Sequence, residues 1–369
     1  MVKELKCAGC GVNIQSLDVH LIGYAPEEAI IRDPLICQRC FRIKHYNESS
    51  QIILNQDHFV KLLSEIALTK ALVVHIIDIF DFEGSMISSL ARFVGQNPIL
   101  LVINKIDLLP KVTNYNRIIN WAQRRAKENS LRVVEVIVVS AKKNMGFDRV
   151  IQGLQKHKLN QDVYVVGATN VGKSTLINRL IADYSDLQAE LTTSMYPGTT
   201  LDIVKIPIQD GTYIIDTPGI VFQHRLTELV DKQDVVKLTM DKPLKPVVFQ
   251  LSDQQTLFFG ALVRFDFVKG ERQSFTCYTS NAIKIHRTKL ERADELYREH
   301  RGVLLQPPDE GHIDQLPQLI KHPIHIPKGK LMDVSISGLG WIKVNRDCGA
   351  DLVVHAPKGV KVVSREAMI

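Results

Sequence analysis

The 369-residue sequence predicts an α/β fold in which a parallel β-sheet is preceded by a cysteine-containing module and followed by a mostly β region. Three observations indicate this class: apolar runs that alternate with helical segments, two Cys-x-x-Cys pairs near the N-terminus, and a change of pattern beyond residue 222. The apolar runs are short and β-branched, and they occupy residues 71–77, 99–103, 133–139 and 163–166. Strands covered by helices on both faces of a parallel sheet read as such near-continuous runs.

Two further runs extend the predicted sheet, at residues 203–208 and 212–215. The turn-forming sequence Gln-Asp-Gly lies between them at 209–211 and predicts an antiparallel hairpin. We therefore expect residues 49–222 to form one α/β domain, after a separate module at 1–48.

The remaining region, 223–369, alternates apolar and polar residues over short stretches. Antiparallel strands are expected at 245–249, 257–267 and 273–278 and within 331–344 and 351–363. The charged amphipathic stretch 282–300 predicts a helix. We expect this region to be a separate α+β or mostly β domain.

The composition is that of a soluble globular protein, with 45% hydrophobic and 23% charged residues. No apolar run approaches the roughly 20 residues of a membrane span, and the N-terminus has no signal or transit pattern. A cytoplasmic protein without membrane contact is therefore expected. The net charge of +6 permits a nucleic-acid partner without requiring one.

Residues 167–174 read Gly-Ala-Thr-Asn-Val-Gly-Lys-Ser, which fits the phosphate-binding pattern G-x-x-x-x-G-K-[ST]. The match lies between a predicted strand and a predicted helix, where backbone N–H groups and the helix N-terminus face phosphate oxygens. Lys173 is expected to reach the β- and γ-phosphates, and Ser174 to bind Mg²⁺. The predicted nucleotide contacts here are Gly167, Asn170, Val171, Gly172, Lys173, Ser174 and Thr175.

The sequence Asp-Thr-Pro-Gly at 216–219 closes the next strand. Asp216 can hold Mg²⁺, usually through water, and the Gly219 amide can sense the γ-phosphate. Ile220 follows, where many nucleotide hydrolases of this kind carry a water-positioning glutamine. An aliphatic side chain cannot orient a water molecule, so slow intrinsic hydrolysis is expected.

The base-recognition signal is Asn-Lys-Ile-Asp at 104–107, directly after the apolar run 99–103. The Asp107 carboxylate can accept from the ring N–H and the exocyclic amine of guanine, a pairing that adenine cannot offer. Lys105 can cover the base face with its stem. Ser-Ala-Lys at Ser140, Ala141 and Lys142 can support the base from the next strand. Together with Asn104, these residues predict GTP and GDP rather than ATP.

These motifs together resemble the translation-factor class of GTPases, but their order is changed. Here the guanine motifs at 104–107 and 140–142 precede the phosphate-binding loop, as in the circularly permuted GTPases, which act in ribosome assembly. The resemblance implies a first-switch threonine, for which Thr200 is the first choice and Thr199 the second, contacting Mg²⁺ and the γ-phosphate. The implied catalytic set is Lys173, Thr200, Asp216 and Gly219.

Two consequences follow from this resemblance. Asn170 matches the asparagine that holds K⁺ in potassium-activated relatives, although a plain loop residue is the alternative; a bound cation there would neutralise transition-state charge. The permuted order also makes the chain leave the G domain directly after the γ-phosphate sensor. Residues 220–229 are therefore hypothesised to carry nucleotide state to the C-terminal domain.

The two cysteine pairs, Cys7 with Cys10 and Cys37 with Cys40, supply four thiolate ligands for a tetrahedral, structural Zn²⁺. Two disulfides are the alternative, which a chain without a secretory signal disfavours. The basic and aromatic residues at 38–46 suit RNA contact or a solvated loop equally well.

The cysteine motifs, the sequence Cys-Gln-Arg-Cys-Phe-Arg-Ile-Lys-His-Tyr-Asn at 37–47 and the permuted G motifs together resemble the YqeH family. The resemblance implies a GTPase of small-subunit assembly with a C-terminal nucleic-acid- or peptide-binding domain. Its expected partners are ribosomal RNA or the pre-ribosomal small subunit and ribosomal proteins, and a monomer is the default. The alternative hypothesis is a nucleotide-gated RNA chaperone in which hydrolysis is incidental.

Overall fold

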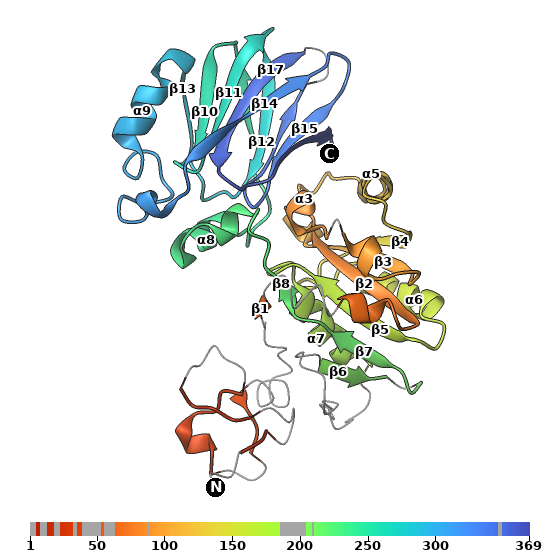
Figure 1. Ribbon diagram of the computed structural model, residues 1–369. Coiled ribbons are helices and arrows are strands. Elements are labelled where there is room, and N and C mark those ends of the chain that lie inside the picture. The colour runs from red at the N-terminus through yellow and green to blue at the C-terminus, as the bar shows by residue number, and fades with distance from the viewer. Residues whose placement is uncertain are drawn as a thin grey trace. The chain divides into compact units, whose positions relative to one another are not determined.

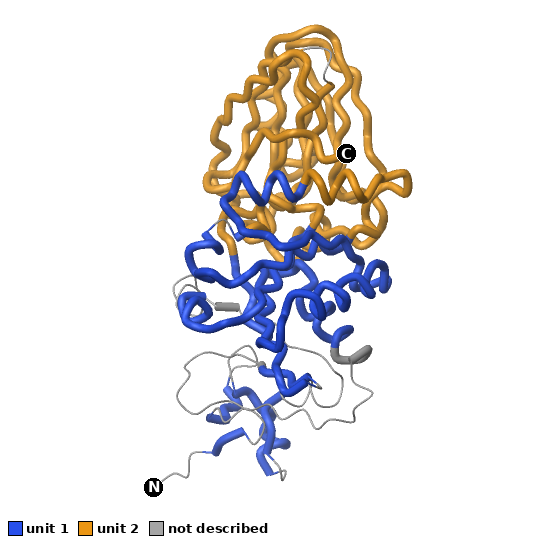
Figure 2. The backbone as a smooth tube through the Cα atoms, turned by 90° about the vertical axis from the view of Figure 1, so that its right-hand side faces the viewer, with its two compact units in different colours: residues 1–78, 87–105, 122–221 blue, residues 79–86, 106–121, 222–369 orange. Residues whose placement is uncertain are grey.

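The computed structural model describes residues 5–7, 13–17, 23–31, 35–38, 53–54, 63–87, 89–184, 204–208, 210–345 and 349–369. The chain divides into two compact units, each built from separate stretches of sequence (Figure 2). Unit 1 contains residues 1–78, 87–105 and 122–221, and unit 2 contains residues 79–86, 106–121 and 222–369. The helices of the described residues include none that is long and apolar enough to cross a membrane.

Unit 1 is built on a six-stranded sheet in the order β4-β3-β2-β5-β7-β6 (Figure 1). Its strands are β2 (Ala71–Asp78), β3 (Ile99–Asn104), β4 (Val133–Val138), β5 (Asp162–Gly167), β6 (Val204–Pro207) and β7 (Tyr213–Asp216). All neighbours pair in parallel except β6 and β7, which form the predicted antiparallel hairpin. Every residue of β2 and β3 is buried. The predicted parallel sheet is thereby confirmed.

Helices follow these strands as a parallel sheet requires. The helices are α4 (Leu90–Phe93), α5 (Tyr115–Glu128), α6 (Phe147–His157) and α7 (Lys173–Tyr184). Of these, α6 contacts β3 and β4, and α7 contacts β5. The short strands β1 (Ile53–Leu54) and β8 (Gly219–Ile220) pair in parallel, and the described N-terminal residues include the single turn η1 (Glu27–Ala29).

Unit 2 contains two antiparallel five-stranded sheets, in the orders β13-β10-β11-β17-β14 and β18-β15-β16-β12-β9 (Figure 1). The strands are β9 (Val247–Leu251), β10 (Gln255–Phe259), β11 (Val263–Gly270), β12 (Gln273–Thr279), β13 (Ile285–Lys289), β14 (Leu319–Ile326), β15 (Met332–Ile336), β16 (Gly340–Val344), β17 (Ala350–Pro357) and β18 (Val362–Glu366). Side chains of both sheets share one hydrophobic core. In it the Phe275 ring lies 5.4 Å from Phe265 and 5.0 Å from Phe267. The prediction of a mostly β region is confirmed.

Helical segments of unit 2 come from three parts of the chain. They are α3 (Phe82–Ser85), η2 (Ile106–Leu108), η3 (Leu226–Glu228), α8 (Lys232–Leu238), η4 (Leu290–Arg292), α9 (Ala293–His300) and η5 (Ile313–Gln315), together with residues 115–121 of α5. The first lies directly after β2, and the second includes the last two residues of the Asn-Lys-Ile-Asp motif. Unit 2 therefore takes in residues that the sequence assigns to the α/β domain.

Two local predictions in the C-terminal region were wrong. The helix expected over 282–300 is confined to α9, because residues 285–289 form β13 and pair with β10 instead. The strand expected over 257–267 is a hairpin of β10 and β11. It turns at Gly260, which has φ +57° and lies so close to the Pro307 carbonyl oxygen that a Cβ atom would approach it to 2.4 Å.

Candidate functional site

The predicted nucleotide residues follow the carboxyl ends of neighbouring parallel strands in unit 1. Asp78 at the end of β2 pairs in register with Asn104 at the end of β3, and Ile76 pairs with Gly167 at the end of β5. Asp216 ends β7, which pairs with β5 on its other side. Ligands of open parallel sheets bind at this edge. The sheet topology thus brings together motifs that are far apart in the sequence.

Asn104 connects three of these motifs through its buried amide group. Its Nδ2 donates to the Val171 carbonyl oxygen at 2.9 Å, and its Oδ1 accepts from the Ala141 backbone N–H at 3.0 Å. A buried amide that satisfies both its donor and its acceptor is a rigid connection. The guanine motif, the phosphate-binding loop and Ser-Ala-Lys therefore form one constellation.

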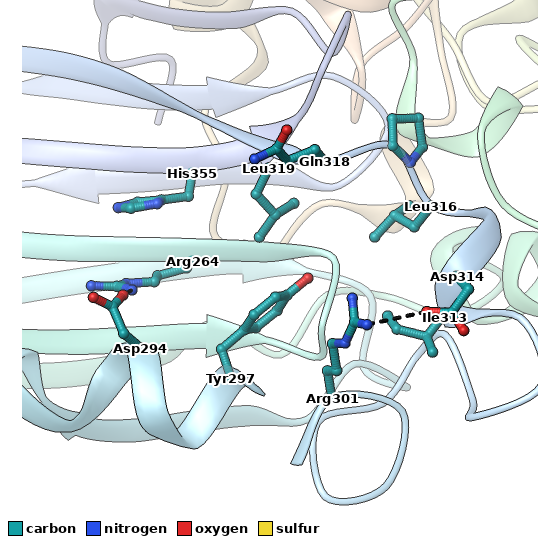
Figure 3. Close-up of a pocket in the computed structure, with 11 residues that line it drawn as sticks. Arg264, Asp294, Tyr297, Arg301, Ile313, Asp314, Leu316, Gln318, Leu319 and His355 are labelled. Atoms are coloured by element: carbon teal, nitrogen blue, oxygen red, sulfur yellow. Dashed lines mark hydrogen bonds and ion pairs between the residues drawn. The ribbon is translucent and has the colours of Figure 1, made fainter. Parts of the chain in front are cut away.

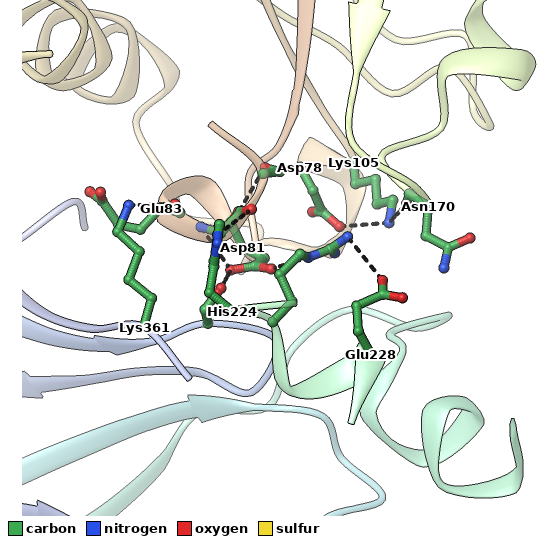
Figure 4. A network of polar contacts seen from close by, with 12 residues as sticks. Asp78, Asp81, Glu83, Lys105, Asn170, His224, Glu228 and Lys361 are labelled. Atoms are coloured by element: carbon green, nitrogen blue, oxygen red, sulfur yellow. Dashed lines mark hydrogen bonds and ion pairs between the residues drawn. The ribbon is translucent and has the colours of Figure 1, made fainter. Parts of the chain in front are cut away.

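Lys105 makes a second connection to the phosphate-binding loop. Its Nζ donates to the Asn170 carbonyl oxygen at 2.6 Å and to Asp78 Oδ2 at 2.6 Å (Figure 4). The ammonium group therefore joins the end of β2 to the loop before α7. Its fixed position leaves the aliphatic stem available to lie against a base.

The loop itself has the backbone conformation that phosphate binding needs. Asn170 has φ +63° and Gly172 has φ +88°, both in the left-handed region. A Cβ atom on Gly172 would come within 2.3 Å of Asn104 Nδ2, so only glycine leaves room for the amide. Ser174 and Thr175 follow in the first turn of α7, where backbone N–H groups are unpaired within the helix.

Lys173 and Asp216 form a buried ion pair at the phosphate end. Asp216 is followed by Thr217, whose hydroxyl donates to the Val165 carbonyl oxygen at 2.9 Å and fixes the turn after β7. The Thr169 N–H donates to the Ile220 carbonyl oxygen at 2.8 Å. The residue after Gly219 is thereby hydrogen-bonded to the phosphate-binding loop. The Asp216 carboxylate, the Lys173 ammonium and the Ser174 hydroxyl in the first turn of α7 are suitable groups for binding a Mg²⁺–triphosphate.

The remaining predicted residues fall in three groups. Ser140 exchanges backbone hydrogen bonds with Met145 at 3.0 and 3.1 Å, which shapes the loop containing Ala141 and Lys142. Asp107 lies in η2, in the stretch assigned to unit 2. The predictions that lie outside the described residues are Thr199, Thr200, Cys10 and Cys40.

The structure brings together one cysteine from each predicted zinc pair. The Cys37 backbone N–H donates to Cys7 Sγ at 3.1 Å, and both side chains are buried. Short bridges pair Lys6 with Asn13 and Gln15 with Tyr24. No cluster of three or more metal-ligating side chains occurs within the described part of the chain.

Asp78 is a site residue that the sequence analysis missed. Its carboxylate is buried and contacts the lysine of the guanine motif. A signal was present, because Asp78 follows the apolar run 71–77 in the same way that Asn104 follows 99–103. An acidic residue at the carboxyl end of a buried parallel strand is a reason to look for a cationic partner.

Unit 2 has a cavity of about 410 Å³ between α9, β14 and β17 (Figure 3). The charged groups that line it are in ion pairs: Arg264 with Asp294 and with the neighbouring Asp266, and Arg301 with Asp314. Burial raises the pKa of Asp266, but hydrogen bonds from His355, Arg264 and Thr256 outweigh it and leave the pKa below its usual value. The cavity therefore shows no uncompensated charge with which to select an ion.

The parallel sheet, the phosphate-binding loop and the bridged guanine motif define a protein of the GTPase class. A family model described as "50S ribosome-binding GTPase" matches residues 162–259, and one described as "YqeH-like, C-terminal" matches residues 272–368. The GTPase match supports binding of GTP or GDP with Mg²⁺.

The whole chain is similar to curated proteins of one family. It is 49% identical over all of both chains to the uncharacterized protein YqeH of Bacillus subtilis. It is 33% identical to the chloroplastic/mitochondrial NO-associated protein 1 of Arabidopsis thaliana, over 92% of this chain and 69% of that protein. GTPase Der of Clostridium perfringens is 27% identical over 52% of this chain and 43% of its own. The chain belongs to the YqeH family.

Proposed function

We propose that this chain is a circularly permuted GTPase that hydrolyses GTP to GDP and phosphate during assembly of the small (30S) ribosomal subunit. The observation that carries the proposal is the bridging of Val171 and Ala141 by Asn104. It joins a guanine motif that comes first in the sequence to a phosphate-binding loop that comes later. The motifs then act as one site despite their permuted order.

In the proposed mechanism, the protein binds and orients the phosphates and stabilises charge as it develops. Lys173 and the N–H groups of the loop would compensate the charge of the phosphate oxygens, and Ser174, Thr200 and Asp216 would hold Mg²⁺. Ile220 has no group that orients the attacking water, so the unaided rate is slow. K⁺ held by Asn170 would raise this rate by neutralising transition-state charge. Equal hydrolysis rates in KCl and NaCl would remove the potassium assignment.

The ribosomal role is tested by cosedimentation with isolated 30S and 50S subunits. The expected result is nucleotide-dependent binding to 30S, with a GTP analogue and GDP giving different bound fractions at each of two salt concentrations. The GTPase family model bears the words "50S ribosome-binding", so the larger subunit is the necessary comparison. Binding to 50S alone would reject the small-subunit assignment.

The second candidate function is a nucleotide-gated RNA chaperone in which hydrolysis is incidental. Ile220 is consistent with this function, because its side chain cannot position the attacking water. Lys173→Ala separates the two candidates, because it removes the lysine proposed to contact the phosphates, and this lysine belongs to unit 1. Loss of assembly activity with RNA binding retained supports the GTPase factor. Retention of both supports the chaperone.

A structural zinc site is part of the proposal for the N-terminal module. The contact between Cys7 and Cys37 supports it, since it joins one member of each pair. The expected result is about one zinc per chain by elemental mass spectrometry, lost in Cys37→Ser. Metal-free protein with no reactive thiols at these positions would instead indicate two disulfides.

A further inference from the structure

The end of β2 carries two acidic residues that belong to different units. Asp78, the last residue of β2, lies in unit 1, and Asp81 lies in the stretch 79–86, which is part of unit 2. Only two residues separate them along the chain. The contacts that hold Asp81 therefore restrict the position of Asp78 through the short connecting backbone.

Asp78 fixes the lysine of the guanine motif. Its side chain is 8% exposed and contacts Lys105 Nζ at 2.6 Å, and the same ammonium donates to the Asn170 carbonyl oxygen. A charge-assisted hydrogen bond in a partly buried site is stronger and more directional than a neutral one. Without the carboxylate, the Lys105 head would lose one of its two anchors. Its stem would then be free to move away from a base.

Asp81 is held by a buried network within unit 2 (Figure 4). Arg225 Nε donates to its Oδ2 at 2.8 Å, and the two side chains are 3% and 4% exposed. The Ser337 hydroxyl and the Gly84 N–H donate to its Oδ1 at 3.1 and 3.2 Å. Removing one member of such a buried pair leaves a charge without compensation, which is far more costly than the net value of the pair.

The rest of the 79–86 stretch is held by residues from the C-terminal part of the sequence. Lys361 Nζ donates to the Glu83 carbonyl oxygen at 3.1 Å, and a ring nitrogen of His224 lies 3.2 Å from the Gly84 carbonyl oxygen. A Cβ atom on Gly84 would lie 1.8 Å from Ser337 Oγ. The stretch therefore has little freedom to move within unit 2.

The stretch 106–121, which begins with the last two residues of the guanine motif, is held in the same unit. The Leu108 carbonyl oxygen accepts from the Leu244 N–H at 2.8 Å. Trp121 Nε1 donates to the Glu366 carbonyl oxygen at 2.8 Å, and the Arg365 guanidinium lies 4.9 Å from the Trp121 ring centroid. The stretch directly after β2 and the stretch directly after Lys105 are thus both anchored to residues of 222–369.

We propose that Asp78 is a positioning residue for guanine recognition, and that the Asp81–Arg225 pair lets unit 2 set the nucleotide affinity from the base end of the site. This rests on the guanine-nucleotide binding of the proposed function. It differs from a lever at residues 220–229, which would act at the γ-phosphate and distinguish GTP from GDP. Coupling through the base end changes the affinity for both nucleotides alike.

The test measures dissociation of a fluorescent GDP and of a fluorescent non-hydrolysable GTP analogue from the full chain by stopped flow. Asp78→Asn and Arg225→Gln are each expected to speed release of both nucleotides about 10-fold, the loss of one charged hydrogen bond. Arg301→Gln is the matched control, because it breaks an exposed Arg–Asp pair of unit 2. Its release rates are expected to match those of the unsubstituted chain.

Two readouts separate positioning from loss of structure. For Asp78→Asn, KM for GTP should rise about 10-fold while kcat at saturating GTP stays within about 2-fold, and Asp78→Glu should recover part of the affinity. If the two changes were independent, the double variant Asp78→Asn/Arg225→Gln would release nucleotide about 100-fold faster. A smaller increase is expected, because both changes act on the same anchor. Fully additive effects, or a fall in kcat that matches the rise in KM, would overturn the proposal.

The unsubstituted chain separates failure of this inference from failure of the proposed function. If it binds no GDP, the proposed GTPase function itself is rejected. If it binds GDP and Asp78→Asn and Arg225→Gln behave like Arg301→Gln, only the coupling is rejected. If Arg225→Gln does not fold, Asp78→Asn decides the positioning role and Ser337→Ala, which removes another hydrogen bond to Asp81, decides the anchor. Unchanged nucleotide release in Asp78→Asn rejects the positioning role, and unchanged release in Ser337→Ala rejects the role of the Asp81 anchor.

Discussion

The two units use buried polar groups for different purposes. In unit 1, Asn104 contacts the phosphate-binding loop at Val171, and Lys173 pairs with Asp216 at the end of β7. In unit 2, the buried Arg365 guanidinium lies 4.9 Å from the Trp121 ring centroid, 5.9 Å from that of Trp341 and 3.8 Å from Asp333. The first set of polar groups is arranged for binding. The second set fixes how the two sheets and the stretch 106–121 pack.

The ionisable groups at the centre of each unit show the same contrast. His75 lies inside β2, and burial lowers its pKa to about 4. Asp333 lies inside β15, and burial raises its pKa to about 6 although Arg365 is near. Both shifts favour the neutral form. Because one group is a base and the other an acid, the two units are expected to respond to acid in opposite directions.

The largest expected effect is a loss of GTP hydrolysis caused by a change in unit 1 alone. Lys173→Ala should reduce GTP hydrolysis about 1,000-fold, because the phosphate charge loses its buried ammonium partner. The thermal unfolding of unit 2 should not change. Lys156→Ala is the control, since that lysine is exposed and its pair with Glu135 is a surface one. Comparable losses in both variants would contradict the assignment of Lys173.

The next largest effect breaks structure in unit 2. Gly340→Ala should destabilise it by about 4 kcal/mol, since its Cβ would lie 2.0 Å from the Tyr278 carbonyl oxygen on the neighbouring strand. Gly359→Ala is the matched control: it also has positive φ, but nothing lies within 4 Å of its Cβ. That control should cost only about 1–2 kcal/mol of backbone strain. Urea unfolding of both variants measures the difference in unfolding free energy. Equal losses of stability would show that backbone strain, and not the contact with Tyr278, causes the destabilisation.

His75 should make unit 1 sensitive to acid. Its folded pKa of about 4 lies below the ordinary 6.5, so the unfolded state binds more protons between these values. Stability is therefore lost as the pH falls through this window, by up to about 3 kcal/mol. Hydrogen exchange of residues 71–78 at pH 7 and pH 4.5 measures the effect. His75→Gln should flatten this dependence, and an unchanged dependence would assign it to another group.

Asp333 should have a slightly smaller effect of opposite sign in unit 2. Its folded pKa of about 6 lies above the ordinary 3.8, so the folded state binds more protons in between. Its contribution is largest below pH 3.8 and is lost as the pH rises through 6, by about 3 kcal/mol. Hydrogen exchange of residues 332–344 should slow relative to 71–78 on acidification. Parallel acid responses in both units would remove the contrast between them.

Much of unit 1 could be predicted because its signals are local. Each motif follows an apolar run, and parallel strands place their carboxyl ends at one edge, so the start of the Asn-Lys-Ile-Asp motif at 104–105 was expected to meet 140–142 and 167–174. The amide of Asn104, the ammonium of Lys173 and the positive φ of Gly172 are also properties of the residue types, so the sequence alone indicates them. Asp78 was missed because its role depends on a lysine 27 positions away.

Tertiary structure alone decided the arrangement of unit 2. Residues 285–289 have helical character in sequence, yet they form β13 because the edge of β10 offers backbone hydrogen bonds. Asp81 and Arg225 are 144 positions apart and would read as ordinary surface charges until the fold buries them together. The sequence by itself thus determined the parallel sheet and the guanine-nucleotide chemistry. Which segments anchor that site was settled by long-range pairing, since burial and charge compensation depend on the whole fold.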